Sequence, residues 1–131
     1  MKRVSVIIPN WNGRRFVEEC IDSLYRQQFD DFETILVDNG STDGSVAFVE
    51  KNFPQVTIVR LDENRGFSGA VNAGITASRA PLVCLLNNDT EVDRRWLGNL
   101  VSALAADPQA GSAASKVLFF SDPQSVNSAG D

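Results

Sequence analysis

Apolar residues follow two spacings along the chain, and the spacing changes several times. Four short continuous runs at residues 4–8, 34–37, 56–59 and 82–86 are rich in valine, isoleucine and leucine. Such runs, bounded by turn-forming residues, predict strands. The last of the four, which contains Cys84, is expected to be a buried strand, and a fifth strand is expected over residues 115–120.

Between these runs the apolar residues recur every three or four positions, which predicts amphipathic helices with one apolar face. Phe16, Cys20 and Leu24 define such a face within residues 14–28, and further helices are expected over residues 45–52, 69–78 and 94–106. The helix at 69–78 is rich in glycine and alanine, so we expect it to pack closely on the sheet. Ser41 or Thr42 is expected to cap the helix at 45–52.

The alternation of strand and helix patterns predicts an α/β protein. Right-handed βαβ crossovers would give a mainly parallel sheet covered on both faces, a three-layer α/β/α arrangement. At 131 residues the chain suits one domain or part of a larger one. Residues 121–131 are polar and turn-rich, and they end as if within a connection.

Three of the predicted strands run into polar clusters, at residues 9–13, 38–45 and 87–91. If these strands are parallel neighbours, their carboxyl ends meet at one edge of the sheet, where ligands bind in open α/β folds. A nucleotide crevice is the functional interpretation. The alternative is that loops are polar in any α/β protein.

The residue types favour the crevice. Asp38 directly follows a strand, where a carboxylate can accept hydrogen bonds from a base or ribose. Asn39 precedes a glycine and is equally well explained as a turn residue. The group Asn87, Asn88 and Asp89 is an array of oxygen ligands suited to a hard divalent cation. We expect Asp89 to hold the cation, and the cation to hold a nucleoside diphosphate.

The remaining polar residues and glycines are not expected to bind phosphate or metal. No Walker pattern and no Gly-x-Gly-x-x-Gly follows the first strand, which removes the main support for a kinase or a dehydrogenase. Arg65 is expected to be solvent-exposed rather than a phosphate ligand. Glu91 and Asp93 are expected to favour the start of the next helix rather than to bind metal.

Composition narrows the function classes. The net charge of −5 argues against nucleic-acid binding, and the absence of histidine leaves acid and base chemistry to carboxylates. Cys20 and Cys84 lie in apolar patterns, so we expect buried free thiols and a cytoplasmic setting. No segment is long enough to span a membrane.

Four motifs together resemble the family 2 glycosyltransferases of the GT-A fold. They lie at residues 4–12, 36–45, 64–74 and 85–91, and they span most of the chain. The resemblance implies that the loop from Pro9 to Asn12, with Asn10 in it, packs against the nucleotide and that Asp38 contacts the base or ribose. It places Asn87, Asn88 and Asp89 at the Asp-x-Asp motif, with Asp89 binding Mn²⁺ or Mg²⁺. Asn87 adds no charge there, so the metal would be held more loosely than by two acids.

The resemblance also implies an inverting transfer of sugar from a nucleoside diphosphate to a hydroxyl of a saccharide or lipid-linked saccharide. The variant motifs are similar to bacterial rhamnosyltransferase-like members that use UDP- or dTDP-sugars for surface polysaccharide. Residues 1–131 would be the part that binds the nucleotide-sugar donor, in the cytoplasm or at the inner face of the membrane. The catalytic base and acceptor site would lie beyond Asp131, which is not itself a credible base. The competing hypothesis is a noncatalytic nucleotide-binding module. Self-association at an uncovered sheet edge is expected if the second part is absent.

Overall fold

The computed structural model describes residues 1–129, which form two compact units. The first unit contains residues 1–26 and 30–92, and the second contains residues 27–29 and the chain from residue 93 onward. Asp131 lies outside the described residues.

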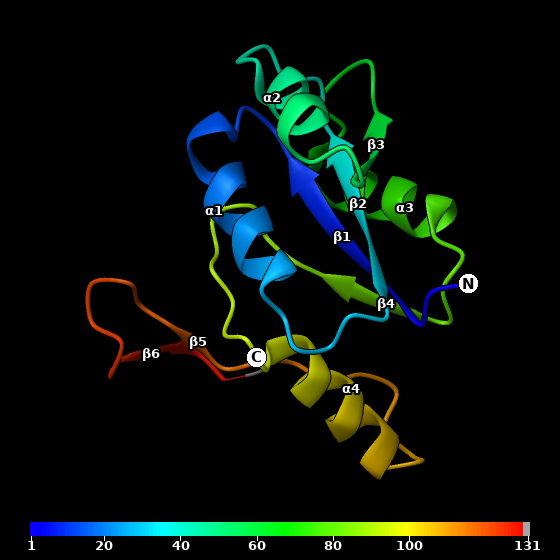
Figure 1. The fold of residues 1–131 in the computed structure, drawn as a ribbon, viewed down its shortest axis with the longest axis vertical. Coiled ribbons are helices and arrows are strands. Elements are labelled where there is room, and N and C mark those ends of the chain that lie inside the picture. The colour runs from blue at the N-terminus through cyan, green and yellow to red at the C-terminus, as the bar shows by residue number, and fades with distance from the viewer. Residues whose placement is uncertain (130–131) are drawn as a thin grey trace. The chain divides into compact units, whose positions relative to one another are not determined.

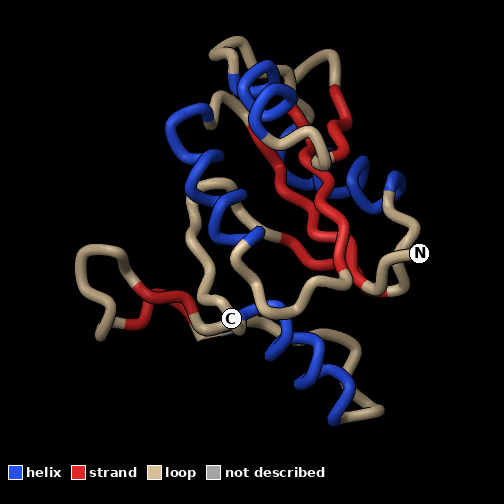
Figure 2. The backbone as a smooth tube through the Cα atoms, in the orientation of Figure 1, coloured by secondary structure: helices blue, strands red, loops and turns tan. Residues whose placement is uncertain are grey.

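The first unit is built on a four-stranded sheet whose strands are all parallel (Figures 1 and 2). Its strands are β1 (Val4–Asn10), β2 (Phe32–Asp38), β3 (Thr57–Arg60) and β4 (Leu82–Leu85), in the order β3-β2-β1-β4. The three strands that precede the polar clusters are therefore parallel neighbours, which meets the condition set above, and their carboxyl ends lie at the same edge.

The strand order explains where the helices lie. The chain moves outward from β1 to β3 through α1 (Arg14–Tyr25) and α2 (Ser45–Asn52), and then returns through α3 (Gly66–Ala77) to β4 on the other side of β1. Right-handed crossovers in opposite directions place helices on opposite faces. Accordingly α1 and α2 lie on one face and α3 on the other (Figure 1), which confirms the three-layer prediction.

Helix α3 packs closely on the sheet because small residues face it. Ala70 joins Ile7, Ile35 and Val37 in a buried cluster. A Cβ added to Gly74 would lie only 2.5 Å from Ile7 Cγ2. The predicted close packing of this helix is therefore confirmed. Helix α1 contributes four fully buried apolar side chains: Val17, Cys20, Ile21 and Leu24.

The prediction that the fourth strand is buried was wrong. Val83 is 42% exposed and Leu85 is 45% exposed. Within the described residues β4 pairs only with β1, and Leu85 lies beside Ile7 in the register, so both face the α3 side. Helix α3 packs on β1, β2 and β3, which leaves the β4 part of that face open.

In the first unit, two helix boundaries differ from the predictions by more than one residue. Helix α1 ends at Tyr25 rather than near residue 28, and α3 begins at Gly66 rather than near residue 69. Neither Ser41 nor Thr42 caps α2. Gly44 occupies the cap position with φ of 81°, and Asp43 Oδ1 accepts a hydrogen bond from the Ser45 backbone N–H.

The second unit contains α4 (Trp96–Ala106) and an antiparallel pair, β5 (Val117–Leu118) and β6 (Val126–Ser128). The fifth strand is shorter than predicted, and β6 was not predicted because its segment is polar. Gln27 stabilises the start of α4, since its Oε1 accepts a hydrogen bond from the Leu97 N–H at 2.9 Å. Among the described residues no helix is long and apolar enough to cross a bilayer.

Candidate functional site

An open cavity of about 470 Å³ lies at the carboxyl ends of β1 and β4, entirely within the first unit. The sheet order reverses between these two strands, and such a reversal is where open α/β sheets bind ligands. Residues at or after the carboxyl ends of all four strands line the cavity: Pro9, Asn10, Trp11, Asn39, Asn64, Gly66, Phe67, Asn87, Asn88 and Asp89.

The structure brings together most of the predicted site residues. Five of the seven line the cavity: Pro9, Asn10, Asn87, Asn88 and Asp89. Asn12 and Asp38 do not line it. Asn12 is exposed and has φ of 49°, its N–H donates to Ser41 Oγ, and its Oδ1 accepts from the Thr42 N–H. It therefore ties the first loop to the second.

Asp38 is only 4% exposed, and both of its oxygens accept hydrogen bonds from the protein. Asn10 Nδ2 donates to Oδ1 at 3.0 Å, and the Ser41 backbone N–H donates to Oδ2 at 3.0 Å. The carboxylate thus organises the two loops around it. Its contact with a base or ribose stays a prediction.

Asn10 is the centre of a hydrogen-bond network beneath the cavity. It is 2% exposed, and its Nδ2 donates to Asp38 Oδ1 and to Ser45 Oγ at 2.9 Å, with Ser41 Oγ at 3.3 Å. Its Oδ1 accepts from Asn88 Nδ2 at 2.9 Å. This last bond joins the loops after β1 and β4, the two walls of the cavity.

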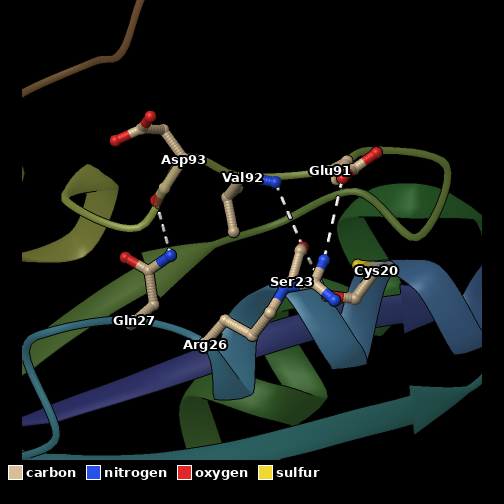
Figure 3. A network of polar contacts seen from close by, with 7 residues as sticks. All are labelled: Cys20, Ser23, Arg26, Gln27, Glu91, Val92 and Asp93. Carbon is tan, nitrogen blue, oxygen red and sulfur yellow. Dashed lines mark hydrogen bonds and ion pairs between the residues drawn. The ribbon is translucent and has the colours of Figure 1, made fainter.

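Helix α1 holds the segment after β4 in place (Figure 3). Cys20 Sγ donates to the Asn87 carbonyl at 3.5 Å, Ser23 Oγ accepts from the Val92 N–H at 3.1 Å, and Arg26 pairs with Glu91 at 3.7 Å. Burial raises the pKa of the Cys20 thiol to about 11, so the thiol is a structural contact rather than a nucleophile.

Glu91 and Asp93 do not lie in the first turn of α4, which contains no acidic residue. Glu91 pairs with Arg26 instead. The Arg95 N–H donates to Asp93 Oδ1, and this hydrogen bond lowers the pKa of the Asp93 carboxyl. Their predicted role at the helix start was therefore wrong for Glu91, whereas Asp93 organises the turn just before the helix.

Sequence reasoning gave no separate role to two aromatic residues that line the cavity, although Trp11 lies in the loop from Pro9 to Asn12 that was expected to contact the nucleotide. Trp11 is 56% exposed and Phe67 is 57% exposed. The available signal was an aromatic residue placed among turn-forming residues, outside any apolar strand or helix pattern. Their rings give the cavity apolar faces on which a planar group can stack.

Asn39, for which a turn role and a functional role were both open, lines the cavity and holds the third loop. Its Nδ2 donates to the Gly66 carbonyl at 3.0 Å, and its Oδ1 accepts from the Arg65 N–H at 2.8 Å. Arg65 itself is exposed, as expected, and does not line the cavity.

Asp89 is the single charged residue among those lining the cavity. Within residues 1–129 no three acidic, thiol or imidazole groups gather as a complete metal site. One carboxylate beside amide oxygens suits a divalent cation that takes its remaining ligands from phosphate and water. A diphosphate beside Asp89 would otherwise meet only negative charge, so the donor set fits a cation shared with the ligand.

The chain is similar in sequence to several glycosyltransferases. The chain is 40% identical to EpsJ, an uncharacterized glycosyltransferase of Bacillus subtilis, over 68% of its own length and 26% of EpsJ. It is 29% identical to a poly(ribitol-phosphate) β-N-acetylglucosaminyltransferase, TarS of Staphylococcus aureus, over 74% of its length and 18% of TarS. The chain thus spans about a quarter of EpsJ and less of TarS.

Solved structures of glycosyltransferases are also similar to this chain. The mannosyltransferase PcManGT of Pyrobaculum calidifontis, solved with GDP-Man and Mn²⁺, matches with a TM-score of 0.78 at 32% identity, over 83% of this chain and 34% of that one. A crystal structure of TarS residues 1–349 matches with a TM-score of 0.73 at 26% identity, over 81% and 33%. These likenesses confirm the GT-A fold.

The family model described as glycosyl transferase family 2 matches residues 5–129, nearly the whole chain. That span includes both cavity walls and the Asn10 network between them. The chain therefore belongs to glycosyl transferase family 2.

Proposed function

We propose that this chain is the donor-binding part of an inverting, metal-dependent glycosyltransferase. It would bind a UDP- or dTDP-linked sugar, for transfer to a hydroxyl of a saccharide or lipid-linked saccharide. The observation that carries the proposal is the cavity at the strand reversal, whose single charged residue is Asp89. The likeness to a mannosyltransferase solved with GDP-Man and Mn²⁺ supports a nucleotide-sugar ligand and a cation.

Each part of the cavity suits one part of such a donor. Asp89 would hold Mn²⁺ or Mg²⁺ against the diphosphate, with Asn87 and Asn88 as neutral oxygen ligands or hydrogen-bond partners. Pro9 and Asn10 would form the nucleotide wall, and Trp11 offers a ring for stacking. Asn12 would support that wall from outside the cavity through its hydrogen bonds to Ser41 and Thr42. Asp38 is proposed to act on the base or ribose, directly or through its neighbours.

The chemistry needs stabilisation of a leaving nucleoside diphosphate. A bound cation supplies that charge stabilisation. Asp89, Asn87 and Asn88 would bind and orient the diphosphate. A base that takes the proton from the acceptor hydroxyl would belong to a further part of the protein, since the chain spans only part of its relatives. Residues 1–131 alone should bind donor and transfer little or no sugar.

The relatives suggest a setting. TarS, as its name states, acts on poly(ribitol phosphate), and we propose a related role in cell-surface polysaccharide synthesis. Cys20 and Cys84 are both free, which supports a reducing compartment and hence the cytoplasm.

Thermal denaturation with UDP, dTDP, GDP and ADP, each with and without Mn²⁺, tests the proposal. A nucleotide at a hundredfold over its dissociation constant adds about 2.7 kcal/mol, which raises Tm by several degrees at this size. Asp89→Ala should abolish the part of the shift that depends on Mn²⁺. Asp62→Asn, which removes an exposed carboxylate outside the cavity, is the control. Rejection of all four nucleotides, or shifts indifferent to Mn²⁺ and Asp89, would refute it.

A further inference from the structure

Asn88 presents its two amide atoms to different surroundings. Its Nδ2 donates to Asn10 Oδ1 and faces Gly13, where an added Cβ would lie 2.1 Å from that nitrogen. Its Oδ1 accepts no hydrogen bond from the described residues, in which every side-chain nitrogen or oxygen shielded from solvent has a partner. The oxygen is therefore open to solvent, and Asn88 is one of the residues that line the cavity.

An amide can rotate by half a turn with little change in shape, so something must fix which atom faces the cavity. Asn10 does this for Asn88, because its Oδ1 needs a donor opposite it. Asn10 is in turn fixed by Asp38. A carboxylate accepts hydrogen bonds and donates none, so the NH₂ group of Asn10 must face Asp38 Oδ1.

Ser45 strengthens this arrangement. The Nδ2 group of Asn10 has two hydrogens, and Asp38 Oδ1 at 3.0 Å and Ser45 Oγ at 2.9 Å are placed to accept both. All three residues are buried, at 2%, 4% and 0% exposure for Asn10, Asp38 and Ser45. Water is therefore a poor substitute for any of these partners, and the orientation is strongly set.

We infer that Asp38 and Asn10 are positioning residues that hold Asn88 with its carbonyl oxygen toward the ligand. The oxygen would accept from a hydroxyl of the nucleotide sugar or bind the cation beside Asp89. The inference rests on the proposed function for its ligand, and on the hydrogen bonds alone for the orientation. Asp38 would therefore act on the ligand indirectly, by orienting Asn10, which in turn orients Asn88.

A double-mutant cycle separates this role from a direct contact. The variants are Asp38→Asn, Asn88→Ala and the pair together, and the ligand is the tightest-binding of UDP, dTDP, GDP and ADP with Mn²⁺. Loss of one hydrogen bond to the ligand weakens binding about tenfold. If Asp38 acts through Asn88, the double variant should also lose about tenfold. A loss near a hundredfold would mean that Asp38 contacts the ligand independently and would overturn the inference.

A metal-free measurement and a control variant complete the experiment. Repeating the Asn88→Ala measurement without Mn²⁺ distinguishes the sources, since the loss disappears if the oxygen binds the cation and persists if it meets a hydroxyl. Asp22→Asn, which removes an exposed carboxylate on α1, should leave affinity unchanged. If Asp38→Asn fails to fold, Ser45→Ala replaces it in the same cycle with the same expectation, because this change removes the other acceptor of the Asn10 amide and Ser45 does not line the cavity.

A ligand-free measurement judges the inference even if no nucleotide binds. In ¹⁵N-labelled protein, one side-chain amide hydrogen of Asn88 should be protected from exchange by its bond to Asn10. Asp38→Asn should remove that protection, whereas Asp22→Asn should not. Unchanged Asn88 signals in Asp38→Asn would overturn the inference, while failure of all four nucleotides with the expected amide result would refute only the proposed function.

Discussion

Replacing Gly13 by alanine should separate the two walls of the cavity. The new Cβ would lie 2.1 Å from Asn88 Nδ2 and 2.4 Å from Asn10 Oδ1, the two atoms that share a hydrogen bond. The backbone of Gly13, with φ of −98° and ψ of 24°, is accessible to alanine. The cost therefore comes from the collision. Asn10 is buried, so the half-buried side chain of Asn88 must move.

Moving Asn88 leaves the buried Asn10 Oδ1 without its donor, which costs about 1–3 kcal/mol. At this chain length that lowers Tm by about 4–10 °C. Displacing Asn88 should also weaken nucleotide binding, because it removes one oxygen from the cavity wall. Thermal denaturation and nucleotide titration measure the two effects. Gly111→Ala is the control, since its added Cβ meets nothing within 4 Å. Wild-type stability and affinity in Gly13→Ala would refute the reasoning.

Two further predictions concern packing and pH. Gly98→Ala should stabilise the protein by up to about 1 kcal/mol, because alanine favours the helix and the added Cβ lies at an ordinary 3.5 Å from Phe29. Gly74→Ala should destabilise the protein, because its added Cβ would lie 2.5 Å from Ile7. Equal urea midpoints for the two variants would contradict this prediction. Burial raises the pKa of Cys20 from 9.0 to about 11, so the unfolded chain releases that proton first, and stability should fall as pH rises from about 9 to 11. The fall should be smaller in Cys20→Ala, and identical urea profiles would contradict this attribution.

The fold was predictable because its signals are local. The spacing of Phe16, Cys20 and Leu24 and the β-branched runs depend only on nearby residues, and the parallel pairing of the strands follows from their alternation with helices. The strand order β3-β2-β1-β4 was not predicted. The exposure of Leu85 was not predictable in the same way. An apolar residue on an edge strand looks like one on a central strand until the reach of the covering helix is known.

The candidate site was predictable in place but not in detail. Polar clusters after neighbouring strands indicated the cavity, and Asp89 was found there. The role of Asn10 depends on partners 28 and 78 residues away, Asp38 and Asn88, whose hydrogen bonds leave no local pattern. Likewise Asp43, rather than Ser41 or Thr42, holds the start of α2, because Gly44 turns the backbone there.

The position of β4 at the edge of the described sheet has a consequence for local stability. This strand is held by hydrogen bonds to one neighbour and carries half-exposed side chains, so it should open at lower free energy than β1 or β2. Opening would carry Asn87 to Asp89 away from the other wall. A ligand that bridges the walls must therefore hold β4 closed. Amide exchange in Leu82–Leu85 should then slow on binding more than exchange in the central strands, so that the weakest strand reports occupancy of the cavity.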